Sequence, residues 1–92
     1  MEVTVTFVGP LIEYTEQRTV RFPFPDGALY GDLLDEFERR FGERVPEPMW
    51  DREGRFFKRG ILVVGAGRDL EARETPLIAD EVIKIVPVVG GG

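Results

Sequence analysis

The segment YGDLLDEFERRFG, residues 30–42, constrains how the rest of the chain can be arranged. Its apolar side chains recur at steps of three and four residues, which places them on one face of a helix, while charged side chains occupy the other face. A glycine at the end of the segment supplies a C-terminal cap. We therefore predict one amphipathic helix that packs on a sheet through Tyr30, Leu33, Leu34, Phe37 and Phe41.

Two strands are predicted before this helix. Apolar and polar residues alternate from Val3 to Phe7 and again around Val20 and Phe22, which is the period of a strand with one buried face. Glycine and prolines end both runs. Because residues 11–17 show no such alternation, we interpret them as a long loop that joins the two strands into a hairpin.

Two more strands are predicted after the helix. Residues 61–64 are a short apolar run between two glycines, a pattern that is typical of a strand buried on both faces. Residues 66–69 are interpreted as a turn. Residues 82–87 form the last strand and lead directly into the glycines at positions 90–92.

The segment 43–60 is long for an irregular loop in a compact domain. We expect it to contain a short turn of helix or to be a feature that binds a partner. Its aromatic residues could either pack beneath the loop as a satellite core or form an exposed interaction patch. Packing as a core is the favoured one.

The order strand, strand, helix, strand, strand predicts an α+β protein of the β-grasp type. In this arrangement a mixed sheet of four to five strands carries one main helix on one face, and a right-handed crossover joins parallel strands. A last strand that pairs with the first would lie at the centre of the sheet. We expect a single domain over residues 1–92, with a flexible C-terminal arm at 88–92.

Composition limits the classes of partner. The chain has 12 Lys and Arg residues against 17 Asp and Glu residues, a net charge of −5. This argues against a nucleic-acid partner, because phosphate binding depends on clustered cations. No segment approaches the roughly 18 apolar residues of a membrane span, and no leader pattern follows Met1. We therefore expect a cytoplasmic protein with no membrane partner.

The residues that usually carry catalysis are missing. The sequence has no His, Cys or Ser, so the common nucleophiles, the neutral-pH base and the zinc ligands are absent together. The adjacent acids Asp80 and Glu81 are interpreted as part of a solvated turn and not as a glycosidase-like pair. We predict that the chain is no enzyme, that it holds no metal, and that its chemistry is supplied by a partner.

The segment VPVVGGG, residues 86–92, indicates what that chemistry is. Gly90, Gly91 and Gly92 have no Cβ atoms, so an arm of these residues is narrow enough to enter a tunnel. The arm delivers a carboxylate, which is a poor electrophile until ATP converts it to an adenylate with AMP as the leaving group. The alternative is a frayed tail without a role.

The same segment resembles the terminal Phe-Pro-Pro-Val-Ala-Gly-Gly of the MoaD/ThiS family of ubiquitin-like sulfur carriers, with Gly90 where Ala is usual. The resemblance covers nearly the whole chain. At the start of the helix, the family's Gly-Asp-Leu-Leu is similar to Gly31-Asp32-Leu33-Leu34. The family's Asn-Gly-Arg-Asp turn resembles Ala66-Gly67-Arg68-Asp69. Its Thr-Pro-Leu-Lys-Asp-Gly-Asp-Glu-Val segment is similar to Thr75-Pro76-Leu77 followed by Asp80-Glu81-Val82. Leu29 replaces the usual capping Thr, Val88 replaces the second Pro, and the segment before Asp80 is one residue shorter.

This resemblance implies a sulfur carrier. An adenylating enzyme of the MoeB/ThiF type, which uses ATP and Mg, would activate Gly92, and sulfur transfer would convert it to a thiocarboxylate. Val89, Gly90 and Gly91 would enter the tunnel of the partner. The sulfur would serve cofactor biosynthesis, with molybdopterin as the leading candidate, and the chain would then be the small subunit beside a MoaE-like large subunit or another acceptor enzyme. The chain itself would bind no cofactor.

Two other functions remain open at this point. The chain is also consistent with a ubiquitin-like modifier conjugated through Gly92, or with a β-grasp module that binds protein or RNA and has no sulfur role. For partner docking we predict the sheet face opposite the helix, through Val82, Lys84 and Val86. The alternative is that these residues only cover the sheet.

Overall fold

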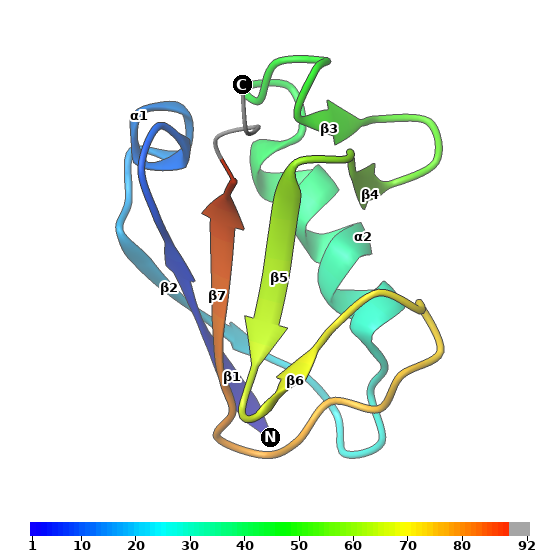
Figure 1. The fold of residues 1–92 in the computed structure, drawn as a ribbon. Coiled ribbons are helices and arrows are strands. Elements are labelled where there is room, and N and C mark those ends of the chain that lie inside the picture. The colour runs from blue at the N-terminus through cyan, green and yellow to red at the C-terminus, as the bar shows by residue number, and fades with distance from the viewer. Residues whose placement is uncertain (89–92) are drawn as a thin grey trace.

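The computed structural model describes residues 1–88, and residues 89–92 lie outside the described part. A five-stranded sheet carries one long helix across one face, and a two-stranded hairpin lies beside that helix (Figure 1). The elements are β1 (Glu2–Phe7), α1 (Leu11–Thr15), β2 (Thr19–Pro23), α2 (Tyr30–Phe41), β3 (Trp50–Asp51), β4 (Phe56–Phe57), β5 (Ile61–Gly65), β6 (Arg68–Asp69) and β7 (Val82–Pro87).

The sheet order is β2-β1-β7-β5-β6. β1 pairs antiparallel with β2 and parallel with β7, while β5 pairs antiparallel with both β7 and β6. The last strand therefore lies at the centre of the sheet beside the first, with α2 in the connection that crosses the sheet. The predicted β-grasp arrangement is confirmed.

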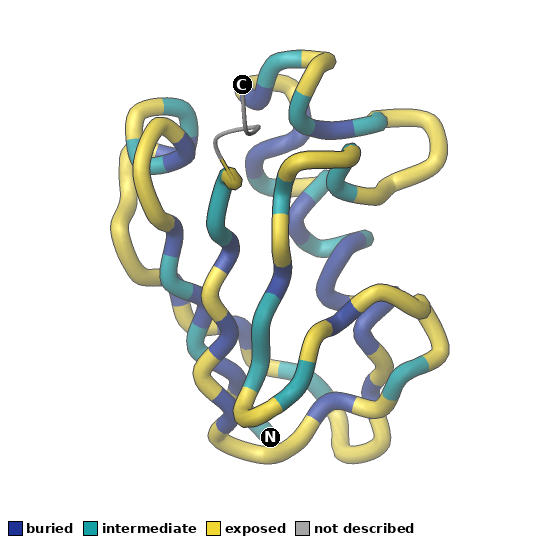
Figure 2. The backbone as a smooth tube through the Cα atoms, in the orientation of Figure 1, coloured by how far each residue is buried: buried dark blue, intermediate teal, exposed yellow. Residues whose placement is uncertain are grey.

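The core lies between the sheet and α2. The five apolar helix residues predicted to pack on the sheet are all buried, and they meet the inward residues of β1, β2 and β7. Phe7 of β1 contacts Phe41 edge-on, with ring centroids 5.7 Å apart. Figure 2 shows the resulting pattern, in which buried positions line α2 and alternate along the central strands. The predicted helix and its buried face are confirmed.

The loop predicted at residues 11–17 contains a short helix, α1. Pro10 is its N-cap residue and Leu11, the first helical residue, is fully buried. Thr15 Oγ1 donates a hydrogen bond to the carbonyl oxygen of Leu11 at 3.0 Å. The prediction of a plain loop was wrong because one buried leucine and one buried threonine anchor a single turn, which is too short to show a periodic pattern.

The segment 43–60 forms the β3–β4 hairpin and not the expected turn of helix. Its aromatic residues pack mostly as core, as predicted. Trp50 is fully buried and lies 4.7 Å from the ring centroid of Phe37, while Phe57 lies 4.8 Å from the same ring. This packing joins the hairpin to the main core, so it is no separate satellite. Phe56 is the exception, because it stays 46% exposed.

The strand β5 is not buried on both faces, as the apolar run had suggested. Only Val63 is buried, and Leu62 is 47% exposed. The physical reason is that α2 covers one face of the sheet, which leaves every second residue of β5 on the other face. The turn predicted at residues 66–69 is tighter than expected, because Arg68 and Asp69 already belong to β6.

Candidate functional site

The sheet face opposite α2 is the candidate site. Along β7, Ile83 and Ile85 point into the core and are buried, whereas Val82 and Lys84 are exposed and Val86 is half-buried. All three residues predicted for docking therefore lie on this open face. The structure places them there by the two-residue period of the strand.

Neighbouring strands extend this surface. Leu62 of β5 lies directly opposite Val86, and Val64 lies opposite Lys84. On the other side of β7, Thr4 and Thr6 of β1 lie beside Val82 and Lys84. We call Leu62, Val82, Lys84 and Val86 the open-face patch. Three of these four side chains are apolar, so the patch is an exposed hydrophobic surface with one positive charge.

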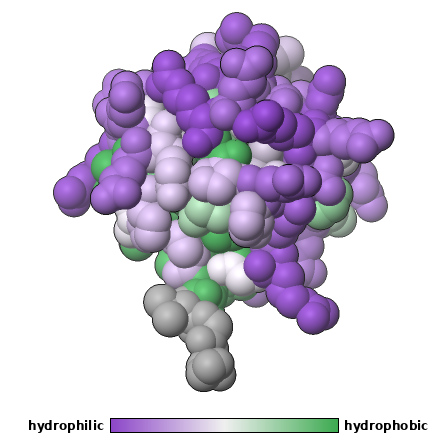
Figure 3. All heavy atoms as spheres, turned by 90° about the horizontal axis from the view of Figure 1, so that it is seen from above, coloured by the Kyte–Doolittle hydropathy of each residue, from purple (hydrophilic) through white to green (hydrophobic). Residues whose placement is uncertain are grey.

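The sheet continues one residue beyond β7. The Val88 N–H donates a hydrogen bond of 2.6 Å to the carbonyl oxygen of Gly60, and on the other side the Val8 N–H donates to the carbonyl oxygen of Ile85 at 3.1 Å. Val88 and Val8 are both exposed. Seen from above, small groups of hydrophobic atoms show between mainly hydrophilic ones, and some of them lie in the lower part of the view (Figure 3). The chain therefore reaches residue 88 beside exposed apolar side chains.

The residues predicted to carry the chemistry follow this point. Val89, Gly90 and Gly91, predicted to enter a partner's tunnel, and Gly92, predicted to bear the reactive carboxylate, lie outside the described residues. What the structure establishes is the position of the residue that precedes them. Val88 is hydrogen-bonded to the start of β5, at the end of the central strand.

Glu81 differs from its interpretation as part of a solvated turn. Its side chain is fully buried and pairs with Arg68, with Nη2 of Arg68 donating to Oε1 at 2.6 Å and Nε donating to Oε2 at 2.9 Å. The backbone N–H groups of Ala66 and Ile78 donate to the same carboxylate. Burial opposes ionisation, but these donors outweigh it, so the pKa of Glu81 is lowered. Glu81 is thus a structural anchor beneath the start of β7.

A second charged cluster fastens the loops near α2. Asp35 accepts hydrogen bonds from Arg73 at 2.7 Å and from Arg55 at 3.3 Å. Partial desolvation acts to raise the pKa of Asp35, but the two guanidinium groups lower it. Burial raises the pKa of the nearby Tyr30 hydroxyl, so Tyr30 is no base at neutral pH. This cluster stabilises the structure and offers no nucleophile.

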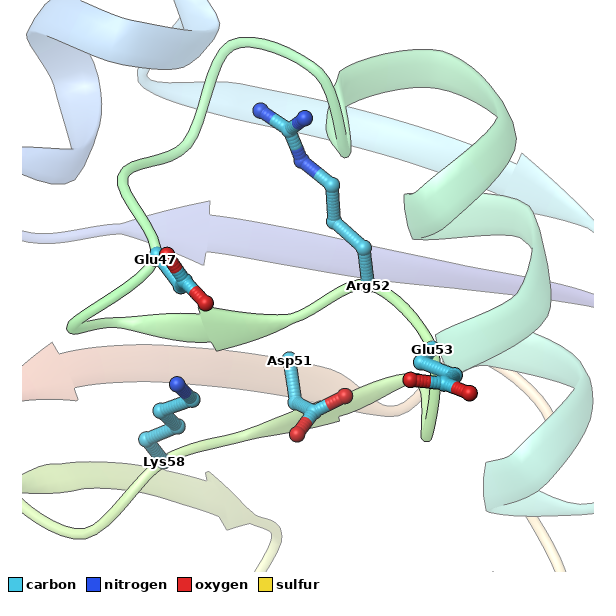
Figure 4. Close-up of a pocket in the computed structure, with 5 residues that line it drawn as sticks. All are labelled: Glu47, Asp51, Arg52, Glu53 and Lys58. Atoms are coloured by element: carbon cyan, nitrogen blue, oxygen red, sulfur yellow. The ribbon is translucent and has the colours of Figure 1, made fainter.

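A hollow of about 390 Å³ beside the β3–β4 hairpin is lined by Glu47, Asp51, Arg52, Glu53 and Lys58 (Figure 4). Arg52 points toward the loop after α2 and donates to the carbonyl oxygens of Gly42 and Glu43. Asp51 accepts a hydrogen bond from the Gly54 N–H at 2.7 Å. Because these side chains serve the local backbone, the hollow presents no catalytic arrangement.

Residues 1–88 contain neither a metal-binding cluster nor a membrane-spanning helix. No cluster of three or more Asp or Glu side chains in this part of the chain is placed to hold a metal ion. Of the helices described, none has the length and apolar character needed to cross a membrane.

Comparison with solved structures identifies what this architecture is similar to. SAMP1 from Haloferax volcanii superposes with a TM-score of 0.80, at 23% identity and with 100% of each chain covered. The chain has a ubiquitin-like β-grasp fold. A Pyrococcus furiosus protein named as molybdopterin converting factor, subunit 1, matches with a TM-score of 0.71 at 19% identity, covering 96% of this chain and 98% of that one. The Amycolatopsis orientalis BexX/CysO complex contains a chain that matches with a TM-score of 0.63 at 23% identity, covering 98% and 99%.

No protein-family model and no curated protein sequence matches this ubiquitin-like chain. The likeness therefore establishes the fold and not the function.

Sequence reasoning missed two residues of this region. The apolar run that contains Leu62 is flanked by glycines, and this pattern predicts that Leu62 lies in the interior. The available signal was the single long helix, since one helix covers only one face of a sheet. Glu81 was assigned to solvent, and nothing in its neighbours indicates that Arg68 reaches it across the β5–β6 turn.

Proposed function

We propose that this chain is a sulfur carrier whose carboxyl group at Gly92 is adenylated and then converted to a thiocarboxylate. An activating enzyme of the MoeB/ThiF type would supply ATP and Mg. The carboxylate attacks the α-phosphate and releases pyrophosphate, after which a sulfur nucleophile displaces AMP from the acyl carbon. The carrier contributes only the acid, in agreement with a sequence that has no His, Cys or Ser.

One observation carries this proposal. The central strand β7 ends beside an exposed apolar patch, and from Val88 the sequence runs Val89-Gly90-Gly91-Gly92. A partner that binds the open-face patch therefore holds the base of this segment next to its own active site. Because the patch lies along the strand that leads into this segment, a rigid body can present a narrow terminus to different enzymes.

We further propose molybdopterin synthesis as the destination of the sulfur, with a MoaE-like large subunit as the acceptor. The similarity to a Pyrococcus furiosus protein named for molybdopterin conversion supports this choice. SAMP1 is named as a small archaeal modifier protein, and the similarity to it favours a second candidate, a protein modifier that is joined through Gly92 to lysine amines. Both candidates share the activation step and differ in the nucleophile that follows.

Intact-mass spectrometry tests the shared step. The intact mass of the protein isolated from its natural source is determined first, because the proposal requires that Gly92 carries the free carboxyl group. Incubation with the cognate activating enzyme, ATP, Mg and a sulfur donor should then exchange one oxygen for one sulfur. A variant that lacks Gly91 and Gly92 should keep its fold and show no exchange. If the full chain also shows no exchange, the proposal is wrong.

A second measurement separates the two candidates. The thiocarboxylate form is mixed with the acceptor subunit and a molybdopterin precursor, and sulfur transfer is followed by the return of the original mass. Isopeptide-linked peptides that contain the C-terminal segment, recovered from cells, would instead favour the modifier.

A further inference from the structure

A second surface lies on the other side of β5, in a groove between α2 and the edge of the sheet. The groove has a volume of about 320 Å³. Its floor is apolar and consists of Tyr30 and Leu34 from α2, Val63 from β5, and Leu70, which follows β6. β6 pairs with Val64 and Gly65, and the Leu70 N–H that follows it donates to the carbonyl oxygen of Val63 at 2.8 Å. We call it the α2–β5 groove.

The rim of this groove is positively charged. Lys58, Arg59 and Arg73 line it, and among the described residues Glu71 is its one carboxylate. Arg73 pairs with Asp35, whereas no ion pair within residues 1–88 involves Lys58 or Arg59. The lining of the groove thus has three cations and one carboxylate beside an apolar floor, in a chain with a net charge of −5. Lys58 is shared with the hollow that contains Glu47, Asp51 and Glu53.

The walls of the groove are held in place by the fold. Arg73 donates hydrogen bonds to the carbonyl oxygen of Arg55 at 3.0 Å, to that of Gly31 at 3.2 Å and to Asp35 at 2.7 Å. These bonds connect the chain after β6 to α2 and to the β3–β4 hairpin, which lie on the same side of the molecule in Figure 1. Because the walls are already ordered, a ligand need not order them on binding.

We propose that the α2–β5 groove binds an extended peptide segment of another protein, in which apolar residues are flanked by Asp or Glu. The floor accepts apolar side chains, and the rim attracts the carboxylates. Phe56 stands at the rim and is 46% exposed, so it adds an aromatic contact of the kind enriched in protein interfaces. Single-stranded RNA fits less well, because it needs several exposed aromatic rings for stacking. Of Tyr30, Phe56 and Phe57 in the lining, only Phe56 is exposed, and the net charge of the chain repels phosphate.

This surface is independent of the open-face patch. Val63 faces the groove, while Leu62 and Val64 face the opposite side of the sheet, because successive residues of a strand alternate. A protein that binds the groove therefore leaves the open face and the residues after β7 accessible. The groove would let the chain stay bound to one protein while another acts on its C-terminal segment.

The test uses a pool of labelled seven-residue peptides, in which Val, Ile, Leu or Phe varies at the two central positions between flanking Asp and Glu residues. Binding to the full chain is measured by fluorescence anisotropy, and the site is mapped by backbone amide NMR. We expect weak binding, with shifts at Leu34, Val63 and Leu70. The double variant Lys58→Glu with Arg59→Glu should weaken binding by about tenfold or more, and added salt should weaken it further.

Matched controls make each outcome decisive. Leu62→Asp changes a side chain as exposed as Phe56 but on the open face, so it should leave peptide binding unchanged, whereas Phe56→Asp should weaken it. Melting followed by Trp50 fluorescence verifies that each variant is folded. The proposal is overturned if no peptide of the pool binds, or if a pool with Lys in place of the acids binds equally well. It is also overturned if the NMR shifts map to the open face, or if a single-stranded RNA 12-mer binds this groove more tightly than the peptides do.

Discussion

Arg68 Nη2 donates a hydrogen bond of 2.6 Å to Oε1 of Glu81, across the β5–β6 turn, and the Glu81 side chain is fully buried. The same carboxylate accepts the backbone N–H groups of Ala66 and Ile78. The pair therefore connects the β5–β6 turn to the residues that lead into β7. Since β7 is the central strand, this ion pair helps to fix where that strand begins.

Removing the guanidinium should destabilise the fold. Arg68→Met leaves the Glu81 carboxylate buried with only backbone donors, and breaking a buried pair in this way costs about 3 kcal/mol. Urea unfolding followed by the fluorescence of Trp50, the single tryptophan, measures the change. Arg21→Met, at an exposed position on β2, is the matched control and should change the unfolding free energy by less than about 0.5 kcal/mol. Equal losses in the two variants would contradict the role of the pair.

The same pair predicts acid sensitivity. The pKa of Glu81 is lowered in the fold below its ordinary value of 4.5, so the folded protein holds the charged form more strongly than the unfolded chain does. The stabilisation is therefore complete above about pH 5 and is lost as the pH falls through the lower folded pKa. Asp35 and Glu36 shift in the same direction, so the informative quantity is a difference. The unfolding free energy of Glu81→Gln should fall less steeply below pH 4.5 than that of the parent chain.

The elements that could be predicted from the sequence are those with a repeated pattern. The apolar face of α2 and the alternation in β1, β2 and β7 follow from local periodicity, and together with the connection through α2 they leave few topologies. The residues of β7 that lie on the open face follow as well, because Ile83 and Ile85 are the more apolar set and therefore point inward. That a partner docks on this face stays a prediction.

The remaining features depend on contacts between distant segments. Trp50 and Phe57 are buried because they pack on Phe37. Glu81 is buried because Arg68 is placed opposite it by the β5–β6 turn. Neither pairing has a local signature, since the partners are between 13 and 20 residues apart in the sequence. The α2–β5 groove was missed for the same reason, because its lining comes from four separate segments.

Gly42→Ala should destabilise the end of α2. A Cβ at this position would overlap Oε2 of Glu38, which accepts a hydrogen bond of 2.6 Å from the indole N–H of Trp50. Displacing Glu38 leaves that buried donor unpaired, at a cost of about 1–3 kcal/mol. This exceeds the roughly 0.5–1 kcal/mol that Ala gains over Gly in a helical conformation, which is the conformation of Gly42.

A double-mutant cycle checks this explanation. In the background Glu38→Ala there is no carboxylate to displace, and only the main-chain oxygen of residue 38, 2.8 Å from the added Cβ, still opposes the change. Adding Gly42→Ala should therefore cost less in this background than in the parent chain. In the parent background the same change should shift the emission of Trp50 and lower the unfolding free energy. Additive effects in the two backgrounds would show that the Glu38 contact is not the cause.

Leu29→Thr should strengthen the start of α2. Leu29 is the N-cap residue and has extended backbone angles, but its side chain cannot accept a hydrogen bond, while the Asp32 carboxylate already accepts the Leu29 N–H at 2.8 Å. A threonine hydroxyl would complete the reciprocal cap, but it would share the Asp32 N–H, which already donates to the carbonyl oxygen of Leu29 at 2.9 Å. The gain should therefore be at the low end of the usual range, about 0.5 kcal/mol. Leu29→Val is the matched control, because valine has the shape of threonine without the hydroxyl. The threonine variant should melt about 2–4 °C above the valine variant, and equal melting temperatures would contradict the prediction.

Charge placed in the open-face patch should block activation without unfolding the chain. Leu62 and Val86 lie opposite each other beside the end of β7, and an Asp at either position puts a carboxylate where an apolar partner surface would dock. We expect Leu62→Asp and Val86→Asp, tested singly, to slow adenylation by the cognate enzyme by about tenfold or more. The measurement is ATP–pyrophosphate exchange, and thermal unfolding followed by Trp50 fluorescence tests whether each variant is folded.

Phe56→Asp is the matched control, since Phe56 is 46% exposed against 47% for Leu62 but lies in the β3–β4 hairpin. Adenylation that is unchanged by the two open-face substitutions, or reduced equally by Phe56→Asp, would place docking elsewhere on the molecule.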